Sequence, residues 1–345
     1  MQPAERILEN LKILSAIPSP TGMTGACADA VCSMLAGMGF RPQKTRKGAV
    51  HCRLAEGQHP ILLCAHLDTL GMAVRAVKPN GRLRYSKIGG WNDNAVENEN
   101  VVIHTRGGKT FTGTVQSVHA SRHVWGDITA EARTDESLEI VLDEDVNTKA
   151  ETEALGIRAG DMVSFDPRLV HTGSGYVKCR FLDDKASAAV LLTLAADIAE
   201  GRLVPARGVT VAFTVYEEIG HGASDLYAQD AEDIVAIDMG CVGSDLNCRE
   251  TQLSICAKDA AGPYDWDLTN ELIARADRLG LDYAVDVYPN YSSDANTALK
   301  GGLDARFACF GPGVFASHGY ERTHEKALWS TLRLAEDLAG VNPAE

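Results

Sequence analysis

Near the start of the chain, hydrophobic residues recur at the spacing of a helix. This pattern predicts an amphipathic helix over 3–15, whose apolar face carries Ile7, Leu8, Leu11 and Leu14. A second amphipathic helix is predicted over 24–37. The next apolar segment, 60–65, is short and continuous, which is typical of a buried strand, and it ends immediately before His66.

From about residue 165 onward, apolar strands alternate with helices. We expect strands at 208–215, 233–238, 283–287 and 305–310, and helices at 184–200, 223–228, 264–279, 294–300 and 325–339. Strands that are apolar on both faces and alternate with helices predict an α/β domain, in which a mostly parallel sheet is covered by helices on both faces.

The long stretch between Asp68 and Asp183 has a different character. It consists of short segments rich in strand-forming residues, separated by the hairpin-type turns KPNG and RGGK, and it shows no long helical period. This pattern predicts a small β-barrel inserted into the α/β domain. We therefore expect residues 1–68 and 167–345 to form the two parts of the α/β domain, and residues 69–166 to form the inserted β-barrel domain.

Length and charge narrow the range of functions. A chain of 345 residues favours two domains, and its 45% hydrophobic and 23% charged residues are typical of a soluble globular protein. The formal net charge of −14 argues against binding to nucleic acid, whose phosphates require a basic surface, and against an anionic membrane surface. We also find neither the apolar core of a signal peptide nor the roughly 20 apolar residues of a membrane span.

The cysteines indicate a compartment. There are nine, an odd number, and they are scattered without a CxxC pair. Several lie inside apolar segments, as Cys64 does, where cysteine acts as a small hydrophobic residue. This usage predicts a reducing, cytoplasmic environment.

Side chains that can bind metal stand at the ends of these apolar segments. Two imidazoles and three carboxylates, one of them able to bridge, are what two divalent ions need when each keeps a position open for water and substrate. Several of them follow predicted strands, where ligand sites of parallel sheets lie. The predicted metal ligands are His66, Asp183, Glu218, Asp238 and His324.

Two further acids have predicted roles in catalysis. Glu217 stands beside Glu218 and remains free to take a proton from a metal-bound water and return it to a leaving amine. Asp68 lies two residues after His66, on the same face of an extended segment. There it is expected to accept the second ring N–H of His66 and so to fix the tautomer of the ligand.

Each candidate also has a purely structural interpretation. Asp183 and Asp294 are suited to capping helices, and Asp238 to forming a turn. His318 is the rival of His324 as the last ligand; we prefer His324 because it directly precedes a helix, whose start could hold the ring in place. Surface or barrel roles are expected for His104, His119, His123 and His171.

With these motifs in this order, the chain resembles the M42 family of dinuclear metallo-aminopeptidases, within the wider group of zinc exopeptidases. The resemblance covers the whole length and rests on the HxD strand end, the β insert after it, the LDDK helix start, the EExG pair, the xDMG acid and a histidine before the last helix. It implies that Asp183 bridges the two metals. One metal site would be completed by His66 and Asp238, and the other by Glu218 and His324. It further implies that Glu217 is the general base and Asp68 the partner of His66.

The resemblance also implies cofactors and partners. The expected cofactors are two divalent ions, Zn²⁺ or alternatively Co²⁺ or Mn²⁺. The expected substrate is a small peptide or peptide-like molecule that is shortened from its N-terminus. The family members assemble through their insert, so a homo-oligomer between a dimer and a dodecamer is expected.

Three motifs depart from the usual family pattern. Members usually read HMDE where this chain reads HLDT, many carry DN or DDR where Lys185 stands, and SHGYERTH replaces the usual region around the final histidine. These departures resemble a branch linked to the metabolism of N-acetylglutaminylglutamine amide. They leave open an N-deacylase or amidohydrolase that acts on an N-blocked, dipeptide-like osmolyte. A non-catalytic assembly or binding protein on the same scaffold is the alternative from another class, but such a protein would have no need of a free base such as Glu217.

Overall fold

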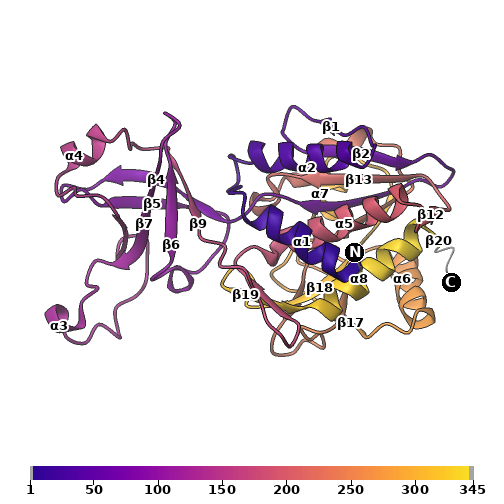
Figure 1. Ribbon diagram of the computed structural model, residues 1–345. Helices are drawn as coiled ribbons and strands as arrows, with labels where there is room; N and C mark the ends of the chain where they lie inside the picture. The colour runs from indigo at the N-terminus through magenta and orange to yellow at the C-terminus, as the bar shows by residue number, and fades with distance from the viewer. Residues whose placement is uncertain (1–2, 342–345) are drawn as a thin grey trace. The chain divides into compact units, whose positions relative to one another are not determined.

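The computed structural model describes residues 3–341. The chain divides into two compact units, one formed by Met1–Asp68 with Arg168–Glu345 and the other by Thr69–Pro167. The first is the α/β unit and the second the barrel unit (Figure 1).

The α/β unit is built on a sheet of twelve strands. Its main path runs, in spatial order, through β1 (Gln43–Lys44), β2 (Val50–Ala55), β13 (Val209–Thr214), β3 (Ile61–His66), β14 (Asp233–Ile237), β18 (Arg306–Phe315), β19 (Glu321–His324), β11 (Tyr176–Cys179) and β10 (Val170–His171). Three more strands extend the sheet from β18: β15 (Gly240–Val242) and β16 (Leu253–Lys258) pair with β18, and β17 (Tyr283–Val287) pairs with β16. The central strands β13, β3, β14 and β18 are parallel, whereas the outer neighbours β2, β19 and β11 pair antiparallel.

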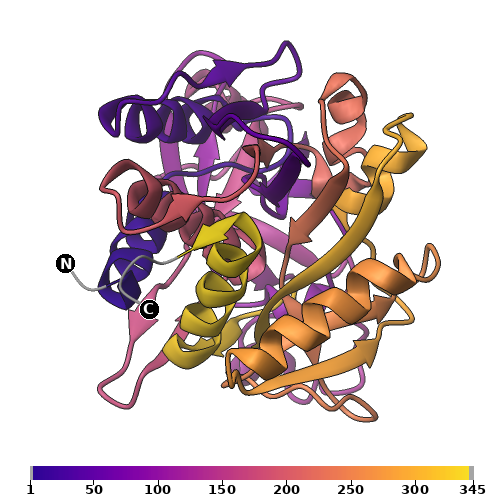
Figure 2. The same cartoon turned by 90° about the vertical axis from the view of Figure 1, so that its right-hand side faces the viewer.

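The central strands are buried on both faces, as their continuous apolar sequences predict. On one face, α5 (Leu182–Ala199) packs on β3, α8 (Glu325–Ala339) packs on β18, and α1 (Pro3–Ser15) packs on α5. On β3, Leu62 and Cys64 face α7 (Asp294–Lys300) and η3 (Gly222–Ala228) in one cluster of buried side chains. Helices therefore cover both faces of the sheet, as predicted (Figures 1 and 2).

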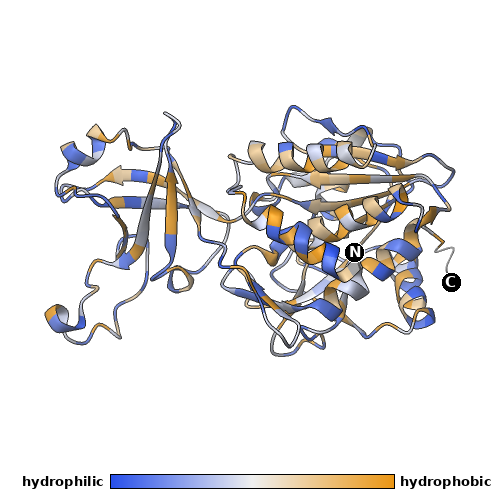
Figure 3. Ribbon diagram, viewed as in Figure 1, coloured by the Kyte–Doolittle hydropathy of each residue, from blue (hydrophilic) through white to orange (hydrophobic). Residues whose placement is uncertain are grey.

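Local patterns explain where these helices lie. Apolar and polar residues alternate along α1, with Ile7, Leu11 and Leu14 fully buried (Figure 3). By contrast, α5 is buried almost along its whole length, because α1 and α8 both pack against it. The remaining α-helices of this unit are α2 (Gly25–Gly37) and α6 (Trp266–Arg278), and a small two-stranded sheet joins β12 (Val204–Pro205) to β20 (Gly340–Val341).

The barrel unit is a closed β-barrel. Its strands follow the spatial order β4 (Gly71–Val77), β5 (Leu83–Ile88), β8 (Leu138–Leu142), β7 (Thr110–Ser117), β6 (Asn100–His104) and β9 (Met162–Phe165). The predicted KPNG and RGGK turns connect the antiparallel pairs β4–β5 and β6–β7. Short helices complete the unit: η1 (Asp93–Ala95), α3 (Arg122–Trp125) and α4 (Lys149–Ala154), the last of which starts with a capping box between Thr148 and Glu151.

All nine cysteines are free thiols. Within residues 3–341, every helix is too short or too polar to cross a membrane.

Candidate metal centre

The predicted ligands gather where neighbouring parallel strands end. His66 is the last residue of β3. The adjacent strand β13 leads into η2 (Glu217–Ile219), and β14, on the other side of β3, is followed directly by Asp238. Because the carboxyl ends of parallel strands lie at one edge of the sheet, these side chains converge there.

Two overlapping groups of side chains could each hold a metal ion. In the first, one ligand atom each from His66, Asp183 and Glu218 lie within 4.8 Å of one another. In the second, the same holds for His66, Asp184 and Asp238. Asp183 and Asp184 stand at the start of α5 but do not have helical backbone angles, so neither acts there as an ordinary helix residue.

Asp183 lies between two histidines. Its Oδ1 is 3.0 Å from Nε2 of His66, and its Oδ2 is 3.3 Å from Nε2 of His318. Burial alone would raise the pKa of Asp183, but the hydrogen bonds from His318 and His66 outweigh it and hold this pKa well below its usual range. A carboxylate that directs one oxygen to each of two imidazoles has the arrangement of a bridging ligand.

Several of the clustered carboxyl oxygens are buried without a hydrogen-bond partner in the described chain: Oδ1 of Asp184, Oε1 of Glu218 and Oδ1 of Asp238. Burial, followed by the charge of Asp183, raises the pKa of Glu218 to about 8 and that of Asp238 to about 7. Burying such oxygens without a partner destabilises the folded protein unless a cation binds them or a proton neutralises them. Carboxylate and imidazole donors are common ligands of zinc and related ions, so the residues present fit divalent metals.

The prediction that His324 and not His318 is the last ligand does not fit the geometry. Nε2 of His318 lies 3.5 Å from Oε2 of Glu218, in addition to its contact with Asp183. His324 instead caps α8: its Nδ1 accepts the N–H of Lys326 at 3.1 Å, and its Nε2 donates to the carbonyl of Ser174 at 2.9 Å. The helix start does hold the ring of His324, and for that reason both ring nitrogens are already used.

Asp68 acts differently from the prediction. Nδ1 of His66 donates to the backbone carbonyl of Asp68 at 2.9 Å, whereas the carboxylate oxygen Oδ1 lies 3.7 Å away. The Asp68 carboxylate accepts the N–H of Glu217 at 3.1 Å and the hydroxyl of Thr21 at 2.7 Å. Asp68 therefore fixes the tautomer of His66 through its main chain, and its side chain holds the turn that carries Glu217 and Glu218.

Glu217 lies beside the two groups without belonging to either. Its Oε2 is 3.7 Å from Nε2 of His66. Burial raises the pKa of Glu217 well above its usual range. The turn is tight, with Tyr216 and Gly220 in the left-handed region at φ 74° and φ 83°. A carboxyl in this place can exchange a proton with a molecule that binds next to His66.

Asp184 was not among the predicted ligands, and two further buried acids beside the site were not recognised either. Ser293 occupies the N-cap position of α7, so the capping role expected of Asp294 is wrong. Asp294 instead accepts the N–H of Ala223 at 2.7 Å and the hydroxyl of Thr214, and its carboxylate lies against Gly222. The other acid, Glu321, is fully buried and accepts the N–H of Asp183 at 2.9 Å. For Glu321 a signal was present, because it lies three residues after His318 in a segment with few other acids.

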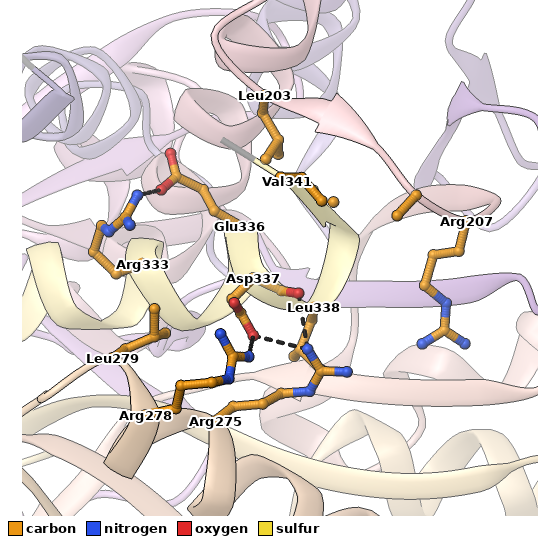
Figure 4. Close-up of a pocket in the computed structure, with 12 residues that line it drawn as sticks. Leu203, Arg207, Arg275, Arg278, Leu279, Arg333, Glu336, Asp337, Leu338 and Val341 are labelled. Atoms are coloured by element: carbon orange, nitrogen blue, oxygen red, sulfur yellow. Dashed lines mark hydrogen bonds and ion pairs between the residues drawn. The ribbon is translucent and has the colours of Figure 1, made fainter. Parts of the chain in front are cut away.

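Another cavity lies elsewhere in the α/β unit. It has a volume of about 470 Å³ and is lined by residues of α6, α8 and the β12–β20 region, including Arg275, Arg333 and Glu336 (Figure 4). It contains none of the predicted ligands. The histidines assigned to surface or barrel roles also lie outside both metal-binding groups.

The sequence as a whole is similar to known aminopeptidases. A family model described as M42 glutamyl aminopeptidase matches residues 48–334. The Bacillus subtilis (strain 168) protein named "Putative aminopeptidase YhfE" is 39% identical over 336 residues, which cover 97% of both chains.

Solved structures show the same fold. Aminopeptidase APDkam598 from the archaeon Desulfurococcus kamchatkensis has a TM-score of 0.85 at 22% identity, over 98% of this chain and 95% of its own. The TET1 peptidase of Pyrococcus horikoshii has a TM-score of 0.85 at 24% identity, over 97% of this chain and 99% of its own. The predicted fold class, an α/β sheet domain with an inserted β-barrel, is confirmed.

Proposed function

Because the chain belongs to the M42 glutamyl aminopeptidase family, it is a peptide-hydrolysing aminopeptidase, as the sequence predicts, and we propose that it works with two divalent metal ions. Asp183 would bridge them, a role supported by its two oxygens facing different histidines. His66 and Asp238 would complete one metal site, and Glu218 and His318 would complete the other. The observation that carries this proposal is the convergence of His66, Asp183, Asp184, Glu218 and Asp238, whose two ligand groups share His66 and include buried carboxyl oxygens without a partner.

The roles of the protein groups follow from their contacts. When bound, two such ions polarise a peptide carbonyl and lower the pKa of an attacking water toward roughly 7. Glu217 takes the proton of that water and gives it to the leaving amine, since its carboxyl lies next to His66. Asp68 keeps Glu217 in place by accepting its N–H. The Thr21 hydroxyl in turn holds the Asp68 carboxylate.

The ions are Zn²⁺, with Co²⁺ or Mn²⁺ as alternatives, because mixed imidazole and carboxylate ligands suit all three. The substrate is a short peptide or peptide-like molecule. The ligands and Glu217 all lie in the α/β unit, which leaves the barrel unit free for assembly. The Pyrococcus horikoshii TET1 peptidase can assemble into a tetrahedron or a large octahedral shell, and we propose that this chain also forms a homo-oligomer through its barrel. Its nine free thiols suit the cytoplasm.

Metal analysis combined with a substrate pair tests the proposal. Dialysed protein is reloaded with Zn²⁺, Co²⁺ or Mn²⁺, and both the bound equivalents and the hydrolysis of dipeptide amides are measured. We expect two equivalents per chain and cleavage of free-amine substrates in preference to their N-acetylated counterparts. Faster cleavage of the N-acetylated substrates would show that the activity is that of an N-deacylase and not of an aminopeptidase. Fewer than two equivalents with no hydrolysis of either substrate would favour a non-catalytic protein.

A further inference from the structure

A single buried carboxylate connects the two chain segments that carry Asp183 and His318. Oε2 of Glu321 accepts the backbone N–H of Asp183 at 2.9 Å, and Oε1 accepts the backbone N–H of His318 at 3.0 Å. We propose that Glu321 is a positioning residue, which sets the distance between the bridging carboxylate and the imidazole so that both bind the same metal ion. This inference rests on the two-metal function proposed above.

The sheet explains how Glu321 reaches both segments. It is the first residue of β19, which pairs antiparallel with β11, and in this register Glu321 lies opposite Cys179. The chain runs from Cys179 directly toward Asp183 at the start of α5. His318 lies in the turn that precedes β19. The pairing of two strands thus places one carboxylate between the end of one segment and the beginning of the other.

The turn before β19 needs such an anchor. His318 has φ 63° and Ala316 has φ 57°, so two residues with side chains stand in the left-handed region that favours glycine. Non-glycine residues keep this conformation only where the surrounding structure holds them, and they occur often at functional sites. The hydrogen bond from the His318 N–H to the buried carboxyl oxygen of Glu321 is one such restraint. It acts on the residue whose ring faces Asp183 and Glu218.

The burial of Glu321 argues against a role in contacting substrate. The residue is fully buried, and both of its carboxylate oxygens are used by main-chain donors. Its charge is also close to that of Asp183, an unfavourable arrangement that bound cations would relieve. Glu321 therefore acts through Asp183 and His318, and its loss should affect the site they share more than the site of His66 and Asp238.

Glutamine at this position separates positioning from general support of the fold. Glu321→Gln keeps the size of the side chain, but its amide has a single acceptor oxygen, so one of the two N–H groups faces an NH₂ donor instead. Asp286 offers a matched control, because it is a buried carboxylate on β17 that accepts the N–H groups of Asn247 and Cys248 at 2.8 and 2.9 Å. Asp286→Asn removes the same type of anchor from a turn that carries no ligand.

The test is a titration of metal-free protein with Zn²⁺ and with Co²⁺, in which the visible absorption of Co²⁺ reports the coordination of each ion. Wild type is expected to bind two ions. Glu321→Gln should bind the ion held by Glu218 and His318 about 10- to 100-fold more weakly, the usual effect of losing a group that orients a ligand. The other ion should be weakened less, because it shares only Asp183 with the disturbed segments. The Co²⁺ spectrum should change mainly for the ion held by Glu218 and His318. Asp286→Asn should bind both ions as wild type does, even where it unfolds at a lower temperature.

Wild-type affinity for both ions in Glu321→Gln would overturn the inference, and so would equal weakening of both ions. Equal weakening in Asp286→Asn would show that any damaged turn has this effect and would also overturn it. A wild-type protein that binds fewer than two ions would instead refute the proposed function. Should Glu321→Ala fail to fold, Glu321→Gln still decides the question, because it retains one of the two hydrogen bonds.

Discussion

Replacing His318 and His324 separately by alanine should produce opposite defects. The two residues lie six positions apart: His318 precedes the short strand β19, and His324 is its last residue. His318 faces Asp183 and Glu218, whereas His324 caps α8 and bonds to Ser174. We therefore expect His318→Ala to lose metal and activity with little change in stability. His324→Ala should lose stability while keeping both metal ions.

The contacts give the magnitudes. Loss of the N-cap costs about 1 kcal/mol, and loss of the hydrogen bond to Ser174 costs about 1 kcal/mol more, so His324→Ala should destabilise the metal-free protein by about 2 kcal/mol. The ring of His318 is 37% exposed. Its removal takes one hydrogen bond from Asp183, so it should lower the free energy of unfolding of the metal-free protein by no more than about 1 kcal/mol. The main effect of His318→Ala should be on metal binding. The affinity for the ion that His318 is proposed to bind should drop by at least ~10²-fold, because a ligand is lost outright and not merely reoriented.

The assay is the same for both variants. Urea unfolding of metal-free protein gives the stability, and competition with a chelator of known affinity gives the metal affinity. The reasoning is refuted if His324→Ala releases a metal ion while His318→Ala retains two. It is also refuted if the two variants cannot be distinguished.

Three further changes have defined outcomes. Glu217→Gln should leave fold and metal content unchanged and lower the rate by at least ~10²-fold in a steady-state peptidase assay. Normal turnover in this variant would show that Glu217 is not the general base. Gly222→Ala places a methyl group against the Asp294 carboxylate and should lower the free energy of unfolding by about 1–3 kcal/mol, whereas Gly243→Ala, with open space around it, should have no measurable effect. Burial, followed by a hydrogen bond with Asp197, raises the pKa of Glu336, which pairs with Arg333 in Figure 4, to about 7 from 4.5. Because the folded state holds this proton more tightly, its contribution to stability should fall as pH rises from 4.5 to about 7, by at most about 3 kcal/mol, and the pH dependence of urea unfolding in Glu336→Gln should lack this fall.

The elements that the sequence predicted well are those with a strong local pattern. The helices over 3–15 and 325–339 and the strand over 283–287 have the predicted bounds, because each has a clear apolar face or breaks at a proline or glycine. The strand β16 has apolar residues too, yet we did not predict it. It pairs with distant strands, and the neighbours that bury a strand are not visible in its own sequence.

The site was predictable in type but not in every contact. Acids and histidines at the ends of apolar strands converge because parallel strands end at one edge, and this rule located His66, Glu218 and Asp238. The choice between two histidines near one strand depends on which ring points toward Asp183. A left-handed turn decides that direction for His318, and the sequence gives little sign of such a turn in a residue other than glycine. The carbonyl contact of Asp68 is equally invisible, since a sequence shows side chains and not main-chain directions.

Glu217 is the residue that favours a hydrolase over a protein that only binds metal. The bridging arrangement of Asp183, with the ligands around it, would suffice to bind ions. Glu217 is an additional buried carboxyl whose pKa is raised by burial, and burying it costs stability that ligand binding alone does not require. Its backbone N–H is nevertheless held by the Asp68 carboxylate, which also accepts the hydroxyl of Thr21. These two hydrogen bonds keep Glu217 beside His66. An acid held near the proposed metal ligands and outside both ligand groups is what proton transfer to a leaving amine requires.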